Sequence, residues 1–285
     1  MAKNNKKTLP KNPYFRIASI ILGLIILLAI GILSFKFIYG EMFSENPRFR
    51  LRNVIVKSSG YWNNRSEDIM RILELKKGTT NLFNLNLSEL RKTLENNKGE
   101  GIASAEVSKE LPDTLKVEIV ERIPQAVLYN KKSGMLADKE GVVMDSKYFK
   151  DMTDSLPIIT GFKISENNKE KSNYFGQTIS VIKPALIFIS IINEDYNDME
   201  IKVINLYSPN KLVVFMEVST NKIVKVTLPF QYSPDPPTTN AEIVESSKLV
   251  RYKLNELREL FKYLKWKNNP FTEINMLYKN QAVVK

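Results

Sequence analysis

Hydrophobic residues form their longest unbroken run near the start of the chain, over residues 17–35. The run contains only apolar and small residues, and its length of about 19 residues is enough for a helix to cross a bilayer once. Tyr14 and Phe15 precede it and Tyr39 follows it, as aromatic residues often do at membrane interfaces. The pattern predicts a single transmembrane helix over residues 17–39.

The charges on either side of this segment predict its orientation. Several Lys and Arg residues and no acid lie in residues 1–16, whereas Glu41 and Glu45 follow the segment. The positive-inside rule therefore places the tail in the cytoplasm and the bulk of the chain outside the cytoplasmic membrane. A cleaved signal peptide is the alternative. Its apolar region would be about 7–15 residues long and would precede a small-residue cleavage site, which residues 35–39 do not offer.

Residues 46–123 have the pattern of a small α/β domain. Strands are expected where apolar residues alternate or cluster, at residues 54–56, 103–107 and 115–120. Two helices are expected to begin near Ser66 and Ser88, and Gly78 is a candidate for the end of the first helix. The predicted order is β-α-α-β-β, which is a small sheet covered by two helices.

The stretch from Leu111 to Tyr129 joins this domain to the next one. Alternation of apolar and polar residues predicts a strand up to about residue 120. Pro124 interrupts the pattern, because proline cannot donate a ladder hydrogen bond. We expect the last strand of the first domain to pass almost directly into the first strand of a second domain over residues 124–285.

This second domain is predicted to be mixed and mostly β, with two helices, so the fold class is α+β. Strands are expected at residues 125–129, 134–145, 201–206, 211–218 and 222–228. One helix begins near Pro184, and a Pro-rich connector covers residues 231–240. The second helix, residues 242–264, has an apolar seam that favours packing on the domain's own sheet over binding a helical partner: Val250, Leu254, Leu257, Phe261 and Leu264.

The last run, residues 272–285, predicts one more strand. Ile274, Met276 and Tyr278 would share one face of it. One interpretation is an ordinary terminal strand that completes the sheet. The other is an edge strand that another chain extends by β-augmentation.

Composition weakens most other classes of function. The net charge is +11, but residues 1–40 contribute +6 of it, so the folded part has no concentrated basic stripe of the kind that binds nucleic acid. The chain has no Cys and no His, the commonest nucleophile, base and metal ligands of enzymes. We therefore expect no catalytic site, cofactor, metal or small-molecule substrate.

Charged residues near the domain junction are expected to serve structure. Asp138 and Glu140 form a possible carboxylate pair, but acids beside Gly141 are more typical of a turn. Glu121 and Arg122 are adjacent on a strand and face opposite sides, so each is expected to have its own structural partner.

An ordered set of short motifs resembles the FtsQ/DivIB family of bacterial cell-division proteins. The set covers nearly the whole chain and includes Leu111, Pro112, Asp113, Leu115, Glu121, Arg122, Pro124, Ala126, Asp138, Gly141, Pro157 and Gly161. The resemblance implies a short cytoplasmic tail, one membrane crossing, a POTRA domain and a β domain. It also implies a non-catalytic scaffold of the divisome, located in the inner membrane at the division septum.

The same resemblance implies where partners bind. In FtsQ-like proteins the last strand and the helix before it form the docking surface for FtsB, held with FtsL. The residues carried over are Ile274, Met276, Tyr278, Ala282, Val284, Arg251 and Arg258. The sequence departs from the family at Asn275 and Leu277, where an acid and an arginine often stand, so a family-type salt bridge is not expected there.

Two other classes of function share some of these features. A membrane-anchored POTRA protein that acts as a chaperone or export adaptor would bind extended polypeptides without preference for one partner. A membrane-tethered cell-wall hydrolase would need two carboxylates about 5–10 Å apart in a cleft, and no spacing in the sequence nominates such a pair.

Overall fold

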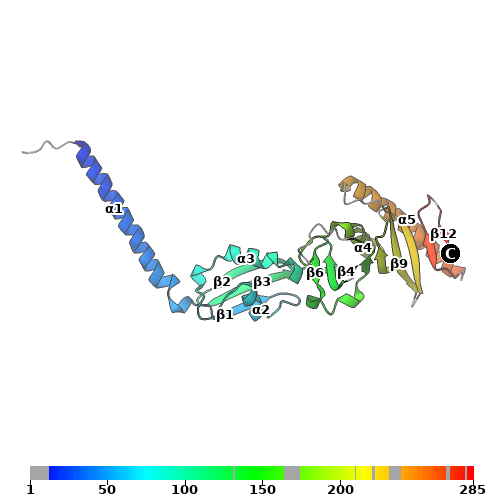
Figure 1. Cartoon of the computed structure of the whole chain (residues 1–285), viewed down its shortest axis with the longest axis horizontal. Coiled ribbons are helices and arrows are strands. Elements are labelled where there is room, and N and C mark those ends of the chain that lie inside the picture. The colour runs from blue at the N-terminus through cyan, green and yellow to red at the C-terminus, as the bar shows by residue number, and fades with distance from the viewer. Residues whose placement is uncertain are drawn as a thin grey trace, which may run out of the picture. The chain divides into compact units, whose positions relative to one another are not determined.

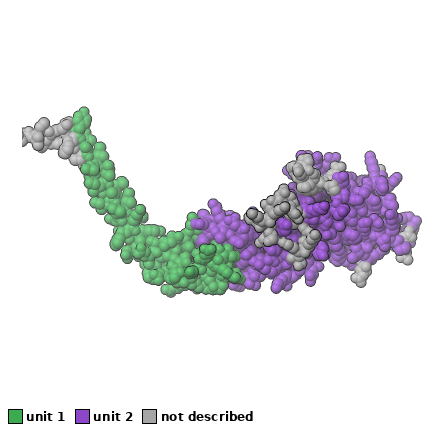
Figure 2. Space-filling view, viewed as in Figure 1, with its two compact units in different colours: residues 1–55, 66–87, 107–116 green, residues 56–65, 88–106, 117–285 purple. Residues whose placement is uncertain are grey.

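The computed structural model is shown in Figure 1. It describes residues 13–130, 132–163, 174–208, 210–219, 222–230, 239–267, 270–279 and 281–285. The predicted tail up to residue 12 and most of the Pro-rich segment 231–240 lie outside the described residues. The chain divides into two compact units, coloured separately in Figure 2: residues 1–55, 66–87 and 107–116, and residues 56–65, 88–106 and 117–285.

The first unit begins with helix α1, Pro13–Tyr39, which continues as one wider helical turn over Gly40–Ser44. Residues 20–44 form a helical segment long and apolar enough to cross a membrane, with a mean hydropathy of 2.7. From Ile20 to Met42 the large apolar side chains are exposed, so they cover no protein core. A lipid bilayer is the environment in which such a surface is stable. The predicted N-terminal apolar helix is confirmed.

The elements of the predicted small domain follow in the expected β-α-α-β-β order. They are β1 (Asn53–Lys57), α2 (Ser66–Ile72), α3 (Leu87–Asn96), β2 (Ile102–Glu110) and β3 (Thr114–Glu121). The strands form a three-stranded sheet in the order β1-β3-β2. Helix α2 is shorter than predicted. Glu74 adopts a φ of +54° just after it, and the N–H of Gly78 instead donates to the carbonyl of Leu51 at 2.8 Å.

An aromatic cluster joins the end of the apolar helix to the rest of the first unit. The ring centroids of Phe43 and Phe83 are 5.0 Å apart, and those of Phe49 and Phe83 are 4.8 Å apart. The buried amide of Asn81 donates from Nδ2 to the carbonyl of Phe43 at 2.9 Å, and its Oδ1 accepts from the N–H of Phe83 at 2.8 Å. One side chain therefore links the membrane-proximal turn to the segment that follows α2.

Replacing Asn81 by alanine should loosen this connection. The change leaves the Phe43 carbonyl and the Phe83 N–H without their partner, at a cost of about 1–3 kcal/mol. Thermal unfolding of the full chain in nanodiscs should show a lower midpoint, while Asn84→Ala, which removes a longer and more exposed bond to Ser44, should change it less. Equal midpoints for the two variants would contradict the role of Asn81.

The second unit contains a mixed sheet of nine strands in the order β12-β11-β10-β9-β8-β7-β4-β5-β6. Their bounds are β4 Pro124–Asn130, β5 Lys132–Asp138, β6 Val143–Asp145, β7 Ile158–Thr160, β8 Glu200–Asn205, β9 Lys211–Ser219, β10 Lys222–Pro229, β11 Glu273–Asn275 and β12 Val283–Val284. The predicted run 134–145 is two strands joined by a turn. Strand β7 was not predicted, because it is only three residues long.

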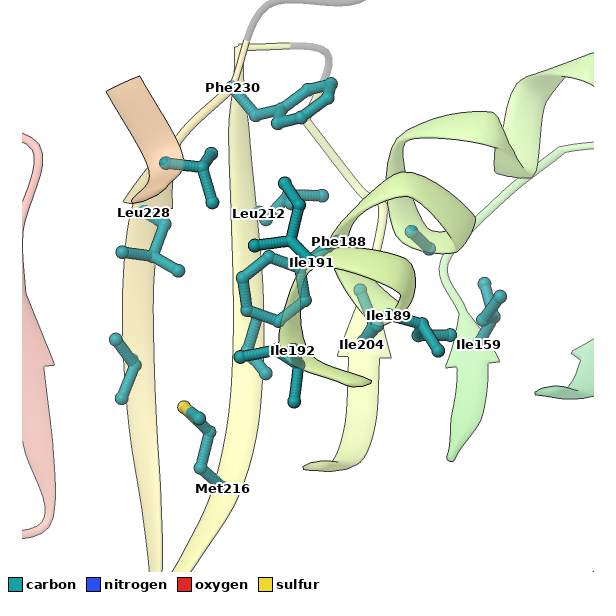
Figure 3. Close-up of a cluster of buried hydrophobic side chains, with 14 of the residues drawn as sticks. Ile159, Phe188, Ile189, Ile191, Ile192, Ile204, Leu212, Met216, Leu228 and Phe230 are labelled. Carbon is teal, nitrogen blue, oxygen red and sulfur yellow. The ribbon is translucent and has the colours of Figure 1, made fainter. Parts of the chain in front are cut away.

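Helices α4 (Lys183–Asp195) and α5 (Asn240–Trp266) supply the rest of the core. Pro184 lies in the first turn of α4, and Thr239 and Glu242 form a capping box at the start of α5. Figure 3 shows α4 placing Phe188 and Ile192 beside Leu212 and Met216 of the sheet. Along the predicted α5 seam, Val250, Leu254, Leu257 and Leu264 are buried and Phe261 is half-buried. The seam packs within its own domain, and the mostly-β prediction with two helices is confirmed.

The C-terminal run differs from its prediction. The single strand expected over residues 272–285 is a hairpin of β11 and β12. Strand β11 lies parallel to β10 on one side and antiparallel to β12 on the other. Asn275 ends β11 because its Oδ1 accepts from the N–H of Leu277 at 3.0 Å, which turns the chain.

Candidate docking site at the end of the nine-stranded sheet

Strand β12 is the terminal strand of the nine-stranded sheet, and the end of the chain is marked beside it in Figure 1. It pairs with β11 in the register Ile274↔Val284 and Asn275↔Val283. The N–H of Lys285 donates to the carbonyl of Glu273 at 2.9 Å, and the N–H of Glu273 donates back at 3.2 Å. Residues of an antiparallel ladder alternate in direction, so the N–H and C=O of Val284 point away from β11. This edge can accept a further strand.

The predicted partner-binding side chains of the hairpin fall into two groups. Ile274 and Met276 are 0% and 1% exposed and belong to the core beneath the sheet. Tyr278 and Val284 are 55% and 37% exposed, and Ala282 is exposed as well. The side chains of Ile274 and Met276 therefore face the domain's own interior, and the accessible part of the hairpin lies beyond β11. Val283, which the sequence reasoning missed, is also exposed.

The two predicted arginines of α5 are both engaged with the end of α4. Arg251 pairs with Asp195 and with Glu194, the latter at 3.1 Å. Arg258 pairs with Asp198 at 2.5 Å and stacks over the ring of Tyr196. A hydrogen bond from Ser190, and then one from Arg251, hold the pKa of Glu194 below its ordinary value. These arginines brace α5 against α4.

The family-motif residues at the start of β3 lie in the first unit. Leu111 and Pro112 are exposed, and the Asp113 carbonyl accepts from the N–H of Arg52 at 2.9 Å. Leu115 is fully buried. These residues form the turn before β3 and its first core contact.

Glu121 and Arg122 each have their own set of partners, both within the second unit. The Glu121 carboxylate accepts from the Ser58 hydroxyl and from the N–H groups of Tyr61 and Trp62 at 3.0 and 2.9 Å. The Arg122 guanidinium pairs with Asp138 and with Glu140.

The pKa of Arg122 lies above its ordinary value. Burial of the guanidinium acts to lower the pKa, but hydrogen bonds to the carboxylates of Asp138 and Glu140 outweigh that effect. Each charge at this junction is thus matched by a structural partner.

Asp138 and Glu140 are parts of one turn. Oδ1 of Asp138 accepts from the N–H groups of Glu140 and Val142, each at 2.9 Å. Gly141 has a φ of +83° in the same turn, where a side chain would be strained. Both carboxylates also bind Arg122. The contacts of Asp138 and Glu140 are thus those of a turn and its ion pairs.

The remaining motif residues position strands β4 and β7. Pro124 is the first residue of β4 and Ala126 is buried within it. The carbonyl of Pro157 accepts from the N–H of Val127 at 2.9 Å, and Gly161, with a φ of +77°, ends β7. Within the described ranges, no three acidic side chains gather as a metal site requires.

Comparison with known proteins agrees with this architecture. Residues 49–122 match the family model of the POTRA domain, FtsQ-type. The chain therefore contains an FtsQ-type POTRA domain after an N-terminal apolar helix. The cell division protein FtsQ of Rickettsia bellii is 38% identical over 93 residues, that of Rickettsia felis 36%, and that of Rickettsia prowazekii 33%. These matches support the expected resemblance to FtsQ proteins over the part that they cover, which is 33% of this chain and 33% of each relative.

Proposed function

We propose that the chain is a non-catalytic, membrane-anchored scaffold of the bacterial cell-division machinery. Its short tail lies in the cytoplasm, and the bulk of the chain lies outside the cytoplasmic membrane at the division septum. It recruits an FtsB-type partner, held with an FtsL-type protein, by adding a strand of that partner to β12. The observation that carries the proposal is the terminal position of β12 in the strand order of the nine-stranded sheet.

The chemistry of this docking is mainly that of the backbone. A partner strand beside β12 would bond to the outward N–H and C=O of Val284, and such bonds do not depend on side-chain identity. Exposed Val283 and Val284 offer small apolar contacts, one on each face of the strand. Asn275 and Leu277 are held in their own turn, which supports docking without a family-type salt bridge at those positions.

Two findings support the division role: the chain contains an FtsQ-type POTRA domain, and the relatives that match part of it are named cell division proteins. The predicted boundaries, 46–123 for this domain and 124–285 for the β domain, remain proposals. So does the role of the exposed hairpin residues as partner contacts.

The test is a binding titration of the full chain in nanodiscs against the extracytoplasmic segment of the FtsB-type protein of the same organism. A variant lacking residues 282–285 keeps β11 and its buried side chains and removes β12. We expect binding by the intact chain and its loss in the variant, with cooperative melting retained in both.

Each other outcome of this titration points to a different conclusion. Binding that survives the deletion would reject β12 as the site. Equal binding of unrelated extended peptides would favour the export-adaptor interpretation.

A further inference from the structure

A charged side chain lies where the apolar seam of α5 meets the sheet. Lys253 is 3% exposed, and its helix neighbours Val250, Leu254 and Leu257 are fully buried in the core. Burying an ammonium group is costly unless it is paired and hydrogen-bonded. The sequence spacing indicates that residue 253 lies on the buried side of the helix, because it falls three residues after Val250 and four before Leu257.

The ammonium group of Lys253 has two acceptors from different parts of the fold. It donates to Oε2 of Glu256 at 2.8 Å and to the carbonyl of Tyr278 at 2.9 Å. The hydrogen bond from Lys253, assisted by one from Tyr252, holds the pKa of Glu256 below its ordinary value against the effect of burial. The Glu256 carboxylate is thus favoured in its ionised form beside this ammonium group. The second bond ties α5 to the connection between β11 and β12.

Strand β11 is fixed in the sheet by its pairing with β10, whereas the part of the hairpin beyond β11 is more exposed. Strand β12 contributes two residues to the ladder, and Val283 and Val284 are both partly exposed. Residues 277–279 of the connection are exposed. A strand that becomes ordered only when its partner binds has a lower affinity, because the entropy lost on ordering reduces the binding free energy. An edge held in place beforehand avoids that loss.

We propose that Lys253 is a positioning residue that holds the β11–β12 connection against α5 and thereby keeps β12 extended and ready for strand addition. This inference rests on the proposed function of β12 as the docking edge. Its structural part, the ordering of the hairpin by one buried lysine, is measured without any partner.

The first test is hydrogen exchange of the full chain in nanodiscs, comparing Lys253→Met with the unmodified protein. Methionine keeps the apolar stem and removes the ammonium group. Exchange of amides in residues 276–285 should become at least about tenfold faster, while amides in β9 and β10 keep their rates. Lys262→Met is the matched control, because Lys262 also pairs with an acid three residues away on α5 but is exposed. It should leave both regions unchanged.

The result that overturns the proposal is unchanged exchange in residues 276–285 of Lys253→Met. A uniform rise that includes β9 and β10 overturns it too, since that is a general loss of stability. If Lys253→Met does not melt cooperatively, Lys253→Gln replaces it. Glutamine retains a hydrogen-bond donor but is too short to reach the Tyr278 carbonyl, and the same comparison of exchange rates applies to this variant.

A second measurement separates this inference from the proposed function. Lys253→Met should bind the FtsB-type segment at least about tenfold more weakly, mainly through slower association, while Lys262→Met binds normally. Equal affinities for Lys253→Met and the unmodified chain would overturn the positioning role. Failure of the unmodified chain to bind would reject the proposed function, and the exchange result would still decide whether Lys253 orders the hairpin.

Discussion

Substitution of Val284 by proline should weaken binding of an FtsB-type strand by about 10- to 100-fold. Proline removes the one backbone N–H of β12 that points away from β11, and a partner carbonyl left without that donor loses about 1–3 kcal/mol. The β11–β12 hydrogen bonds come from neighbouring residues, including Lys285 and Glu273, so the hairpin should persist. Titration of the full chain in nanodiscs, with hydrogen exchange to check the hairpin, measures both effects.

Val284→Ala is the matched control for this prediction. Alanine keeps the N–H and removes only part of a side chain that is already 37% exposed. Its affinity should stay within a fewfold of the unmodified chain. Proline and alanine variants that bind equally well would show that the outward backbone of β12 takes no part in docking, whatever the strength of binding.

The second large effect is expected at Arg122, whose replacement by methionine should lower the free energy of unfolding by about 3–5 kcal/mol. The change leaves the Asp138 carboxylate, whose side chain is 5% exposed, without its cation. The two backbone N–H donors of the turn remain, which limits the loss. Chemical denaturation of the full chain in nanodiscs is the measurement.

A double-mutant cycle with Asp138→Asn tests whether the loss comes from this pair. Asparagine keeps the shape of the aspartate side chain and one acceptor oxygen but has no charge. In the Asp138→Asn variant, Arg122→Met should therefore lower the free energy of unfolding by less than it does in the unmodified chain. Glu140→Gln, at the exposed end of the same site, should have a small effect by itself. Additive losses at Arg122 and Asp138 would contradict the coupling.

The sequence predicts those parts of the fold whose patterns are long and regular. The apolar helix follows from a long unbroken run of apolar residues. The β-α-α-β-β order and the seam of α5 follow from the spacing of apolar residues along each element. Short elements are different. Strand β7 has three residues and β12 has two, so neither provides a full period of alternation.

The strand proposed to carry the docking site was predicted as one strand, not as a hairpin. The run after residue 272 predicts one strand, whose place in the sheet the sequence leaves open, and the structure has two strands there. The difference arises at Asn275, whose side chain closes a turn that alternation does not reveal. Lys253 was missed because a lysine on a helix is ordinarily at the surface, and its acceptor on Tyr278 lies 25 residues away in the sequence.

The apolar helix has a further consequence for a docking edge as short as β12. Linking two partners by a short flexible linker gives effective concentrations of about a millimolar, and confinement of two proteins to one membrane acts in the same direction. A free-solution dissociation constant near 1 mM, about −4 kcal/mol, is then enough for substantial occupancy. If β12 docks a membrane-anchored partner as proposed, a short ladder suits that setting, because the two proteins can assemble where their local density is high and separate where it falls.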